Sequence, residues 1–83
     1  MNEERIPLSA VAPGEVGVVC QLAGGRGFMS RLAAMGFTLG AEVTMVQNFG
    51  RGPVIVLVRD TRVALGRGEA IKVLVSRRGS SHG

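Results

Sequence analysis

Residue types that catalysis and metal binding depend on are scarce in this chain. Its 83 residues include one cysteine and one histidine, with no tryptophan or tyrosine. A single cysteine, Cys20, excludes an intrachain disulfide and a zinc site built on paired cysteines. We therefore expect its thiol to be buried and to have no catalytic or metal-binding role. His82 lies beside the C-terminus in a polar segment that we expect to be mobile, where no rigid catalytic geometry forms. Nucleophilic catalysis therefore lacks its base.

Long apolar runs are also missing. The longest aliphatic run, Val54 to Val58, has five residues, whereas a membrane-spanning helix needs roughly 18 to 20. The acidic start of the chain, residues 1–5, leads into no apolar stretch, so it does not match a secretory signal. We expect a cytoplasmic location.

The acidic residues form no visible catalytic pair. Glu15, Glu42, Asp60 and Glu69 each fall in or beside an expected turn or strand end, where turn chemistry and solubility explain them. The glycine-rich segment 25–30 has a serine where a dinucleotide-binding fingerprint needs its third glycine, and no Gly-Lys-Ser/Thr motif is present. The sequence predicts no enzyme and no cofactor.

The apolar residues follow the two-residue period of β-strands over most of the chain. Val16, Val18, Cys20 and Leu22 are predicted to share one strand face. The strands expected after it lie at 43–46, 54–58, 62–65 and 73–75. We expect a hairpin between the two middle segments, with its tight turn at Asp60-Thr61.

One segment has the helical period instead. Phe28, Leu32 and Met35 recur at i, i+4 and i+7, and Gly36 is placed to end the helix. Residues 69–70 predict a single helical turn before the last strand. These elements predict a mainly β fold: a small barrel with one short helix inserted after the first strand and a single helical turn before the last.

Methionine and phenylalanine are expected mostly in the core. Met29, Met35 and Met45 fall within helix or strand patterns, where flexible thioethers fill gaps. Phe28 and Phe37 are also assigned to the core, which leaves Phe49, in a loop, as the aromatic side chain free to stack.

Positive charge is concentrated in the C-terminal part, where residues 51–83 carry seven cations and two acids. A basic small barrel can neutralise phosphates, so RNA binding is the alternative function. The arginines available for it are Arg51, Arg59, Arg62, Arg67, Arg77 and Arg78. Because stacking aromatics are scarce, we expect no nucleic acid partner.

The order of several short motifs resembles the FeoA family. The most specific motif is RLAAMGF at 31–37, followed by GAEV at 40–43. Weaker matches lie at 8–15, 18–19, 53–56, 63–65 and 69–75. The chain departs from the family pattern at Leu39, where a proline is usual. A similar module occurs at the C-terminus of iron-dependent repressors of the diphtheria toxin regulator type.

The resemblance implies an SH3-like barrel at 6–75. The polar and basic residues after it, 76–83, are expected to form a flexible tail. The resemblance also implies a non-catalytic cytosolic protein of bacterial ferrous iron uptake that contacts the GTPase-containing portion of the membrane permease FeoB. The membrane is then reached only through the permease. A metal sensor that dimerises through surface ligands, and a homo-oligomer, remain open alternatives.

Exposed loop residues are the candidates for partner binding, because loops on rigid barrels often carry function. We expect Arg26, Arg31, Phe49 and Arg51 to contact the partner, since they fall in or near the loops that flank the predicted helix. No catalytic, cofactor or metal-ligating residue is predicted.

Overall fold

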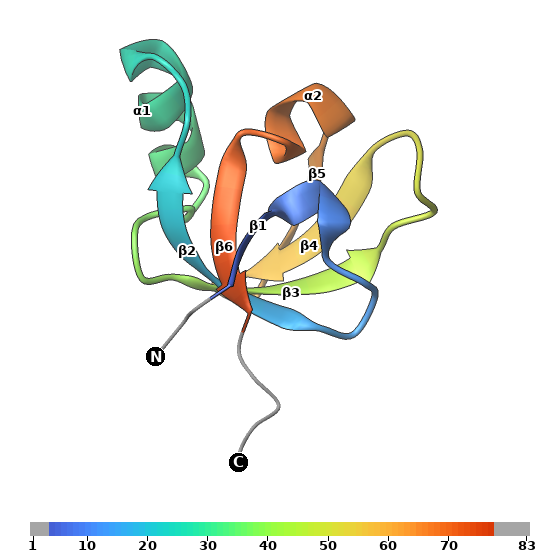
Figure 1. Ribbon diagram of the computed structural model, residues 1–83. Coiled ribbons are helices and arrows are strands. Elements are labelled where there is room, and N and C mark those ends of the chain that lie inside the picture. Colours follow the sequence, from blue (N-terminus) through green and yellow to red (C-terminus); the bar gives the residue numbers. More distant parts are fainter. Residues whose placement is uncertain (1–3, 78–83) are drawn as a thin grey trace.

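The structure, a computed structural model, describes residues 4–77 as a curled β-sheet with two helices at its margins (Figure 1). In chain order the elements are β1 (Arg5–Pro7), the 3-10 turn η1 (Leu8–Ala10), β2 (Val16–Leu22), α1 (Arg26–Ala34), β3 (Glu42–Gln47), β4 (Val54–Val58), β5 (Thr61–Leu65), α2 (Arg67–Ala70) and β6 (Val73–Arg77). The mainly β class, the inserted helix and the helical turn before the last strand are confirmed.

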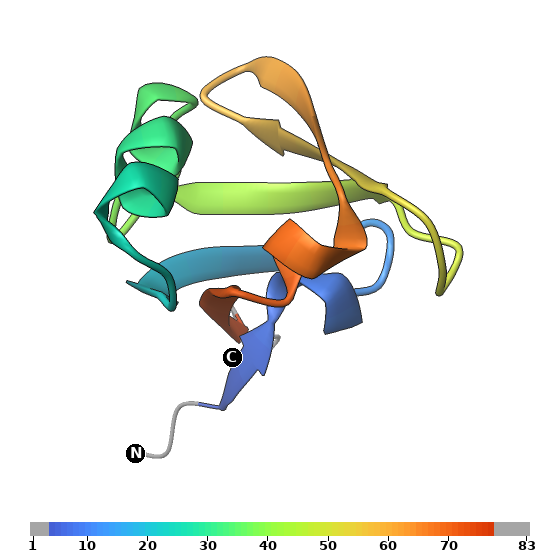
Figure 2. The ribbon, with the colours of Figure 1, turned by 90° about the horizontal axis from the view of Figure 1, so that it is seen from above.

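The six strands form one antiparallel sheet in the order β1-β6-β2-β3-β4-β5. The sheet curls so that its two ends approach each other, and α2 lies over the space between them (Figures 1 and 2). Strand β4, the most apolar segment, has a neighbour on both sides. It is therefore an inner strand of the sheet and presents no free edge.

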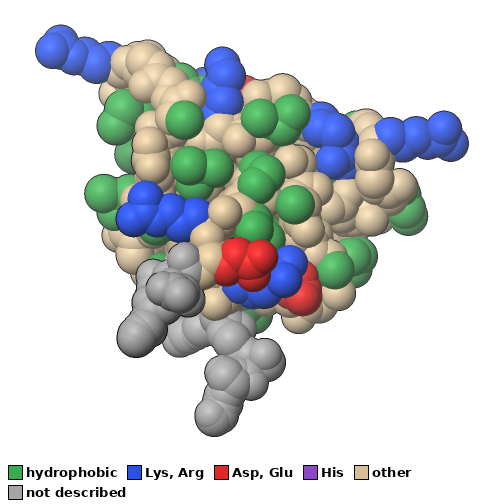
Figure 3. Space-filling view, viewed as in Figure 1, with side chains coloured by type: hydrophobic (Ala, Val, Ile, Leu, Met, Phe, Trp, Pro, Cys, Tyr) green, Lys and Arg blue, Asp and Glu red, His purple; other side chains and the backbone are tan. Residues whose placement is uncertain are grey.

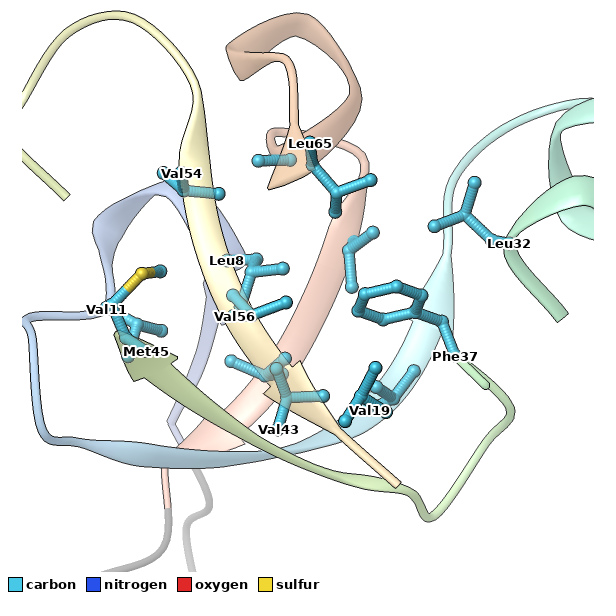
Figure 4. Packing of buried hydrophobic residues seen from close by; sticks show 14 residues of the cluster. Leu8, Val11, Val19, Leu32, Phe37, Val43, Met45, Val54, Val56 and Leu65 are labelled. Carbon is cyan, nitrogen blue, oxygen red and sulfur yellow. The ribbon is translucent and has the colours of Figure 1, made fainter. Parts of the chain in front are cut away.

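A single apolar core fills the inside of the curl (Figure 4). Leu32 enters it from α1, Phe37 from the segment after α1, and Met45 from β3. The other fully buried side chains are aliphatic and come from η1 and the residue after it, from α2 and from every strand except β1. Among the described residues no polar or charged side chain is fully buried, so burial of apolar surface dominates the stability.

The expected strand count was too low by one at the N-terminal end. Strand β1 pairs only with β6 among the described strands. Because β1 has three residues, it is too short for its periodicity to be recognised in the sequence. The helix α1 therefore follows the second strand. At the other end, β6 includes Ser76 and Arg77, which the sequence assigned to the tail, because they pair with β1 and β2. The rest of the expected tail, 78–83, and His82 lie outside the described residues.

The predicted common face of β2 is wrong. Gly17 and Val19 point into the core, whereas Val16 and Val18 are only half-buried on the outer side. The pairing with β6 slips between Val19 and Gln21, and this bulge turns Leu22 back toward the core. Periodicity alone did not reveal which face is buried or where the alternation breaks.

The hairpin between β4 and β5 turns one residue earlier than expected, at Arg59 and Asp60. Both residues have positive φ, 52° and 62°, which is the left-handed conformation that a two-residue type I′ turn requires. An L side chain in that conformation costs free energy that glycine does not.

Replacing Asp60 by glycine is expected to raise the free energy of unfolding by about 0.5–1 kcal/mol, because the left-handed strain is removed. Asp60→Ala is the matched control: it keeps the strain and loses the carboxylate that helps aspartate tolerate this conformation. Urea denaturation followed by circular dichroism should rank the glycine variant above the natural protein and the alanine variant below it. Equal stability of the two variants would contradict the explanation.

Candidate partner-binding surface

Helix α1 is held to the barrel along one narrow stripe. Leu32 is fully buried, and Phe28 and Met35 pack partly against the core, as the helical spacing predicted. The helix ends where Gly36 takes a φ of 104° and Phe37 N–H donates to the Leu32 carbonyl at 2.9 Å. Most of the remaining helix surface faces solvent.

Met29 was expected in the core and is instead 43% exposed. It follows Phe28 directly on the helix, so it lies about 100° around the axis from the buried stripe. The other two methionines agree with the prediction, since Met45 is buried and Met35 packs against the core.

An ion pair links the two helices. Arg31 of α1 pairs with Glu69 of α2, and Glu69 also accepts a hydrogen bond from the N–H of Gly66 at 3.4 Å. Nearby, the ammonium of Lys72 lies 5.5 Å from the centre of the Phe28 ring. Arg31 is therefore already engaged in the free protein. The side chain of Arg26, exposed at the first position of α1, makes no hydrogen bond or ion pair with the described residues.

The loop between β3 and β4 is braced at its base and exposed at its tip. Asn48 donates through Nδ2 to the carbonyls of Ser9 and Val11, both at 2.9 Å, and accepts from the N–H of Gly50 at 3.0 Å. These bonds tie the start of the loop to η1.

Arg67 of α2 reinforces the same loop base. Its guanidinium donates to the carbonyl of Gly52 at 3.0 Å, to Oδ1 of Asn48 at 2.7 Å and to the carbonyl of Ser9 at 3.3 Å. Because these bonds join α2 to the loop and to η1, Arg67 is a structural cross-link, although its three acceptors are neutral and form no ion pair with it. Beyond this base, Phe49 is 75% exposed and Arg51 is exposed beside it.

The four predicted partner residues fall into two groups. Arg26 and Arg31 belong to α1, and Phe49 and Arg51 belong to the β3–β4 loop. In both ribbon views α1 and this loop lie at opposite ends of the molecule, with α2 between them (Figures 1 and 2). The loop does not flank the helix as the sequence suggested, because the curl of the sheet separates them.

Several arginines that could serve nucleic acid are engaged within the protein. Arg59 donates to Oγ1 of Thr38 at 3.1 Å, and Arg77 lies 3.6 Å from a carboxylate oxygen of Glu4 and 3.8 Å from one of Glu15. Arg67 is the cross-link described above, and Arg78 lies outside the described residues. On the face in Figure 3 the cations lie apart around the margin and form no continuous stripe.

Metal and membrane features are limited. Residues 4–77 contain no group of three or more His, Cys, Asp or Glu side chains placed to hold a metal ion. Cys20 is half-buried rather than buried, and its thiol donates to the carbonyl of Leu74 at 3.4 Å. None of the helices in this part of the chain has the length and apolar character needed to cross a bilayer.

Comparison with known proteins identifies the family. A family model described as FeoA domain matches residues 6–77. The chain belongs to the FeoA family. A protein of Methanocaldococcus jannaschii provisionally named Fe(2+) transport protein A is 36% identical to it over 69 residues, which are 83% of each chain.

Solved FeoA structures share the fold. A crystal structure of an FeoA described as an iron uptake regulatory protein matches with a TM-score of 0.86 and 35% identity, over 90% of this chain and 100% of that one. The zinc complex of Stenotrophomonas maltophilia FeoA, described as a procaryotic SH3 domain protein, matches with a TM-score of 0.72 and 32% identity, over 92% and 99% of the two chains.

The repressor resemblance also holds at the level of fold. The IdeR of T. acidophilum matches 94% of this chain with 36% of its own, at a TM-score of 0.81 and 14% identity. The SH3-like barrel is thus confirmed. Membership of the FeoA family connects the chain with ferrous iron transport.

Sequence reasoning missed Asn48 and the structural role of Arg67. Asn48 was recognisable as a loop former from its place two residues before Gly50, which allows an asparagine turn. Nothing local indicated that Arg67 would reach it, because the two residues are 19 positions apart.

Proposed function

We propose that this FeoA protein is a non-catalytic cytoplasmic accessory protein of ferrous iron uptake, which binds the cytosolic GTPase portion of the permease FeoB. The observation that supports this most strongly is the family match over residues 6–77. A chain whose described residues hold no metal-ligating cluster suits a protein that acts by binding another protein.

The β3–β4 loop is the better of the two predicted contact regions. An exposed aromatic side chain beside an exposed arginine is the composition typical of interface hot spots. The hydrogen bonds at Asn48 and Gly52 brace both ends of the loop, which reduces the backbone freedom that the segment carrying Phe49 and Arg51 would lose on binding. On α1, by contrast, Arg31 must give up its ion pair with Glu69 to contact a partner.

The RNA alternative receives less support. Three of its six arginines, Arg59, Arg67 and Arg77, bond to groups of the same chain. Phosphate binding would also make the affinity fall steeply with salt, because counterions are released on binding. One experiment therefore distinguishes the two functions: titration of this protein with the GTPase portion and with an unrelated RNA, each at two salt concentrations.

Replacing Phe49 by alanine is expected to weaken binding to the GTPase portion by at least about tenfold, because a buried aromatic anchor contributes more than 1.4 kcal/mol. The charge reversal Arg51→Glu should weaken binding more than Phe49→Ala does, and it should also change the salt dependence of binding. Isothermal titration with the purified proteins measures both.

The matched control is Leu39→Ala, since Leu39 is 69% exposed but lies in the connection between α1 and β3. It should bind as the natural protein does. Full affinity in the Phe49→Ala and Arg51→Glu variants would remove the loop from the interface. The charge reversals Arg26→Glu and Arg31→Glu then test the α1 region in the same assay. Salt-sensitive binding to RNA with none to the GTPase would overturn the proposed function.

A further inference from the structure

Strand β5 forms one end of the sheet. It pairs with β4 over five residues, from Thr61 opposite Val58 to Leu65 opposite Val54, and the structure gives it no second neighbour among residues 4–77. The register with β4 runs without a bulge. Its free side is therefore a regular strand edge.

The hairpin geometry identifies the backbone groups that face outward. In a two-residue hairpin the pair that flanks the turn, here Val58 and Thr61, exchanges both hydrogen bonds, and the pairs alternate from there. The N–H and C=O groups of Arg62 and Ala64 consequently point away from β4. Both residues are exposed, and no hydrogen bond within the described part of the chain uses these four groups.

This edge lacks most of the features that normally prevent strand addition. Proteins protect sheet edges with proline, bulges, very short strands or inward charges. The other end of the sheet has such protection, because β1 is three residues long and includes Pro7. Strand β5 has no proline, glycine or bulge, and its only charge, Arg62, points to the outer face opposite Leu57.

The start of this edge is open. A shallow hollow separates it from the end of α1 and is lined by residues 33–36 together with Arg59 and Thr61. Small side chains from α1 make up much of this lining, so an added chain has room beside Thr61.

The side chains around the edge specify its occupant. On the outer face an added strand would place one side chain beside Arg62 and another beside Ala64, which is next to Ile55. The first position favours a carboxylate, because Arg62 forms no ion pair with any residue in 4–77. The second position favours an apolar group. Cations also outnumber acids by six to two over residues 51–77, which favours an acidic chain.

A second copy of this chain fits less well. The protein has a formal net charge of +4, so two copies repel each other. Two-fold pairing of β5 with itself, when centred on Arg62, would set the two Arg62 side chains directly opposite each other, which is destabilising.

We propose that the free edge of β5 binds an extended acidic segment of a partner protein as an added antiparallel strand, with a carboxylate beside Arg62 and an apolar side chain beside Ala64. This site is separate from the β3–β4 loop, and it does not depend on the identity of the permease as partner. The recognition mode is strand addition, in which backbone hydrogen bonds supply affinity and alternate side chains supply specificity.

The test is a nuclear magnetic resonance titration of the labelled protein with the capped peptide Glu-Thr-Val-Val-Glu-Thr. Aligned antiparallel, this peptide sets its second glutamate beside Arg62 and its first valine beside Ala64. The largest shift changes, and slowed amide exchange, are expected at Arg62 and Ala64. The peptide Lys-Thr-Val-Val-Lys-Thr should bind at least about tenfold more weakly.

Ala64→Pro blocks the edge without removing a bond of the β4–β5 ladder, because the N–H of Ala64 points outward. Binding should weaken by at least about tenfold, whereas Ala64→Thr, which keeps the N–H, should stay within about threefold of the natural protein. Unchanged protection of the Val56 and Val63 amides shows that the variant is folded. Should it unfold, Arg62→Glu replaces it, and that variant should prefer the lysine peptide.

Shift changes centred on α1 or on the β3–β4 loop would overturn the proposal, as would equal affinity of the proline and threonine variants. Light scattering on the protein alone tests whether a second copy of the chain binds this edge instead. A dimer that Ala64→Pro dissociates would show that it does. If the natural protein binds the GTPase portion but not the glutamate peptide, the strand-addition site is refuted and the proposed function stands.

Discussion

Replacing Gly17 by alanine is expected to lower the free energy of unfolding by about 2 kcal/mol, because the position has no room for a methyl group. Gly17 is buried on β2, and a Cβ there would lie 2.7 Å from Cγ2 and 2.8 Å from Cβ of Val75. Val75 is itself fully buried in β6, which is hydrogen-bonded on both sides, so neither strand can move away. Urea denaturation followed by circular dichroism measures the loss.

Two further variants separate this clash from a general effect of alanine. Gly27→Ala in α1 meets no atom within 4 Å and should raise stability by about 0.5–1 kcal/mol, because alanine favours the helix. In the Gly17→Ala background, Val75→Gly, which removes Cβ as well as Cγ2, should cost clearly less than it does alone, with a coupling energy of about 1 kcal/mol or more. Additive effects of the two substitutions would show that the close approach is not the cause.

The second large effect is expected at Arg67, where replacement by alanine should cost about 3 kcal/mol of unfolding free energy. The substitution removes three hydrogen bonds from a charged donor and leaves the Gly52 carbonyl without its side-chain partner, while Oδ1 of Asn48 and the Ser9 carbonyl keep one donor each. Because those acceptors belong to the β3–β4 loop and η1, amide hydrogen exchange should accelerate in the loop more than in the β2–β6 ladder.

Arg67→Lys and Arg62→Ala are the controls. Lysine keeps the charge but cannot reproduce the fork geometry, so most of the loss should remain. The exposed side chain of Arg62 makes no hydrogen bond within residues 4–77, so its loss should change stability by less than about 0.5 kcal/mol. If lysine restored full stability, charge rather than geometry would be what Arg67 supplies. A loosened loop should also weaken GTPase binding if the proposed contact through Phe49 is right.

The regular elements were predictable because their signals are local. The helix followed from the spacing of Phe28 and Leu32 and from Gly36, whose positive φ ends it. Strand β4 followed from its run of β-branched residues. Strand β1 was missed because a three-residue strand has no period and forms only when β6 is beside it.

The partner-binding residues were predicted as one surface and are two separate regions. Exposure of Phe49 and Arg51 in a loop could be read from glycine and proline around them. Their distance from Arg26 and Arg31 could not, because it depends on how the sheet curls between the loop and α1. The ion pair between Arg31 and Glu69 joins residues 38 positions apart and was equally invisible.

By itself the sequence determined that this protein is a small, mainly β domain, and its motifs placed it in the FeoA family. Only the tertiary structure decided which face of β2 is buried, that Arg67 is a cross-link, and that β5 ends the sheet with a free edge. The reason is physical: propensity and periodicity act between neighbours in the chain, whereas close approach, cross-linking and edge exposure arise between segments that meet only on folding.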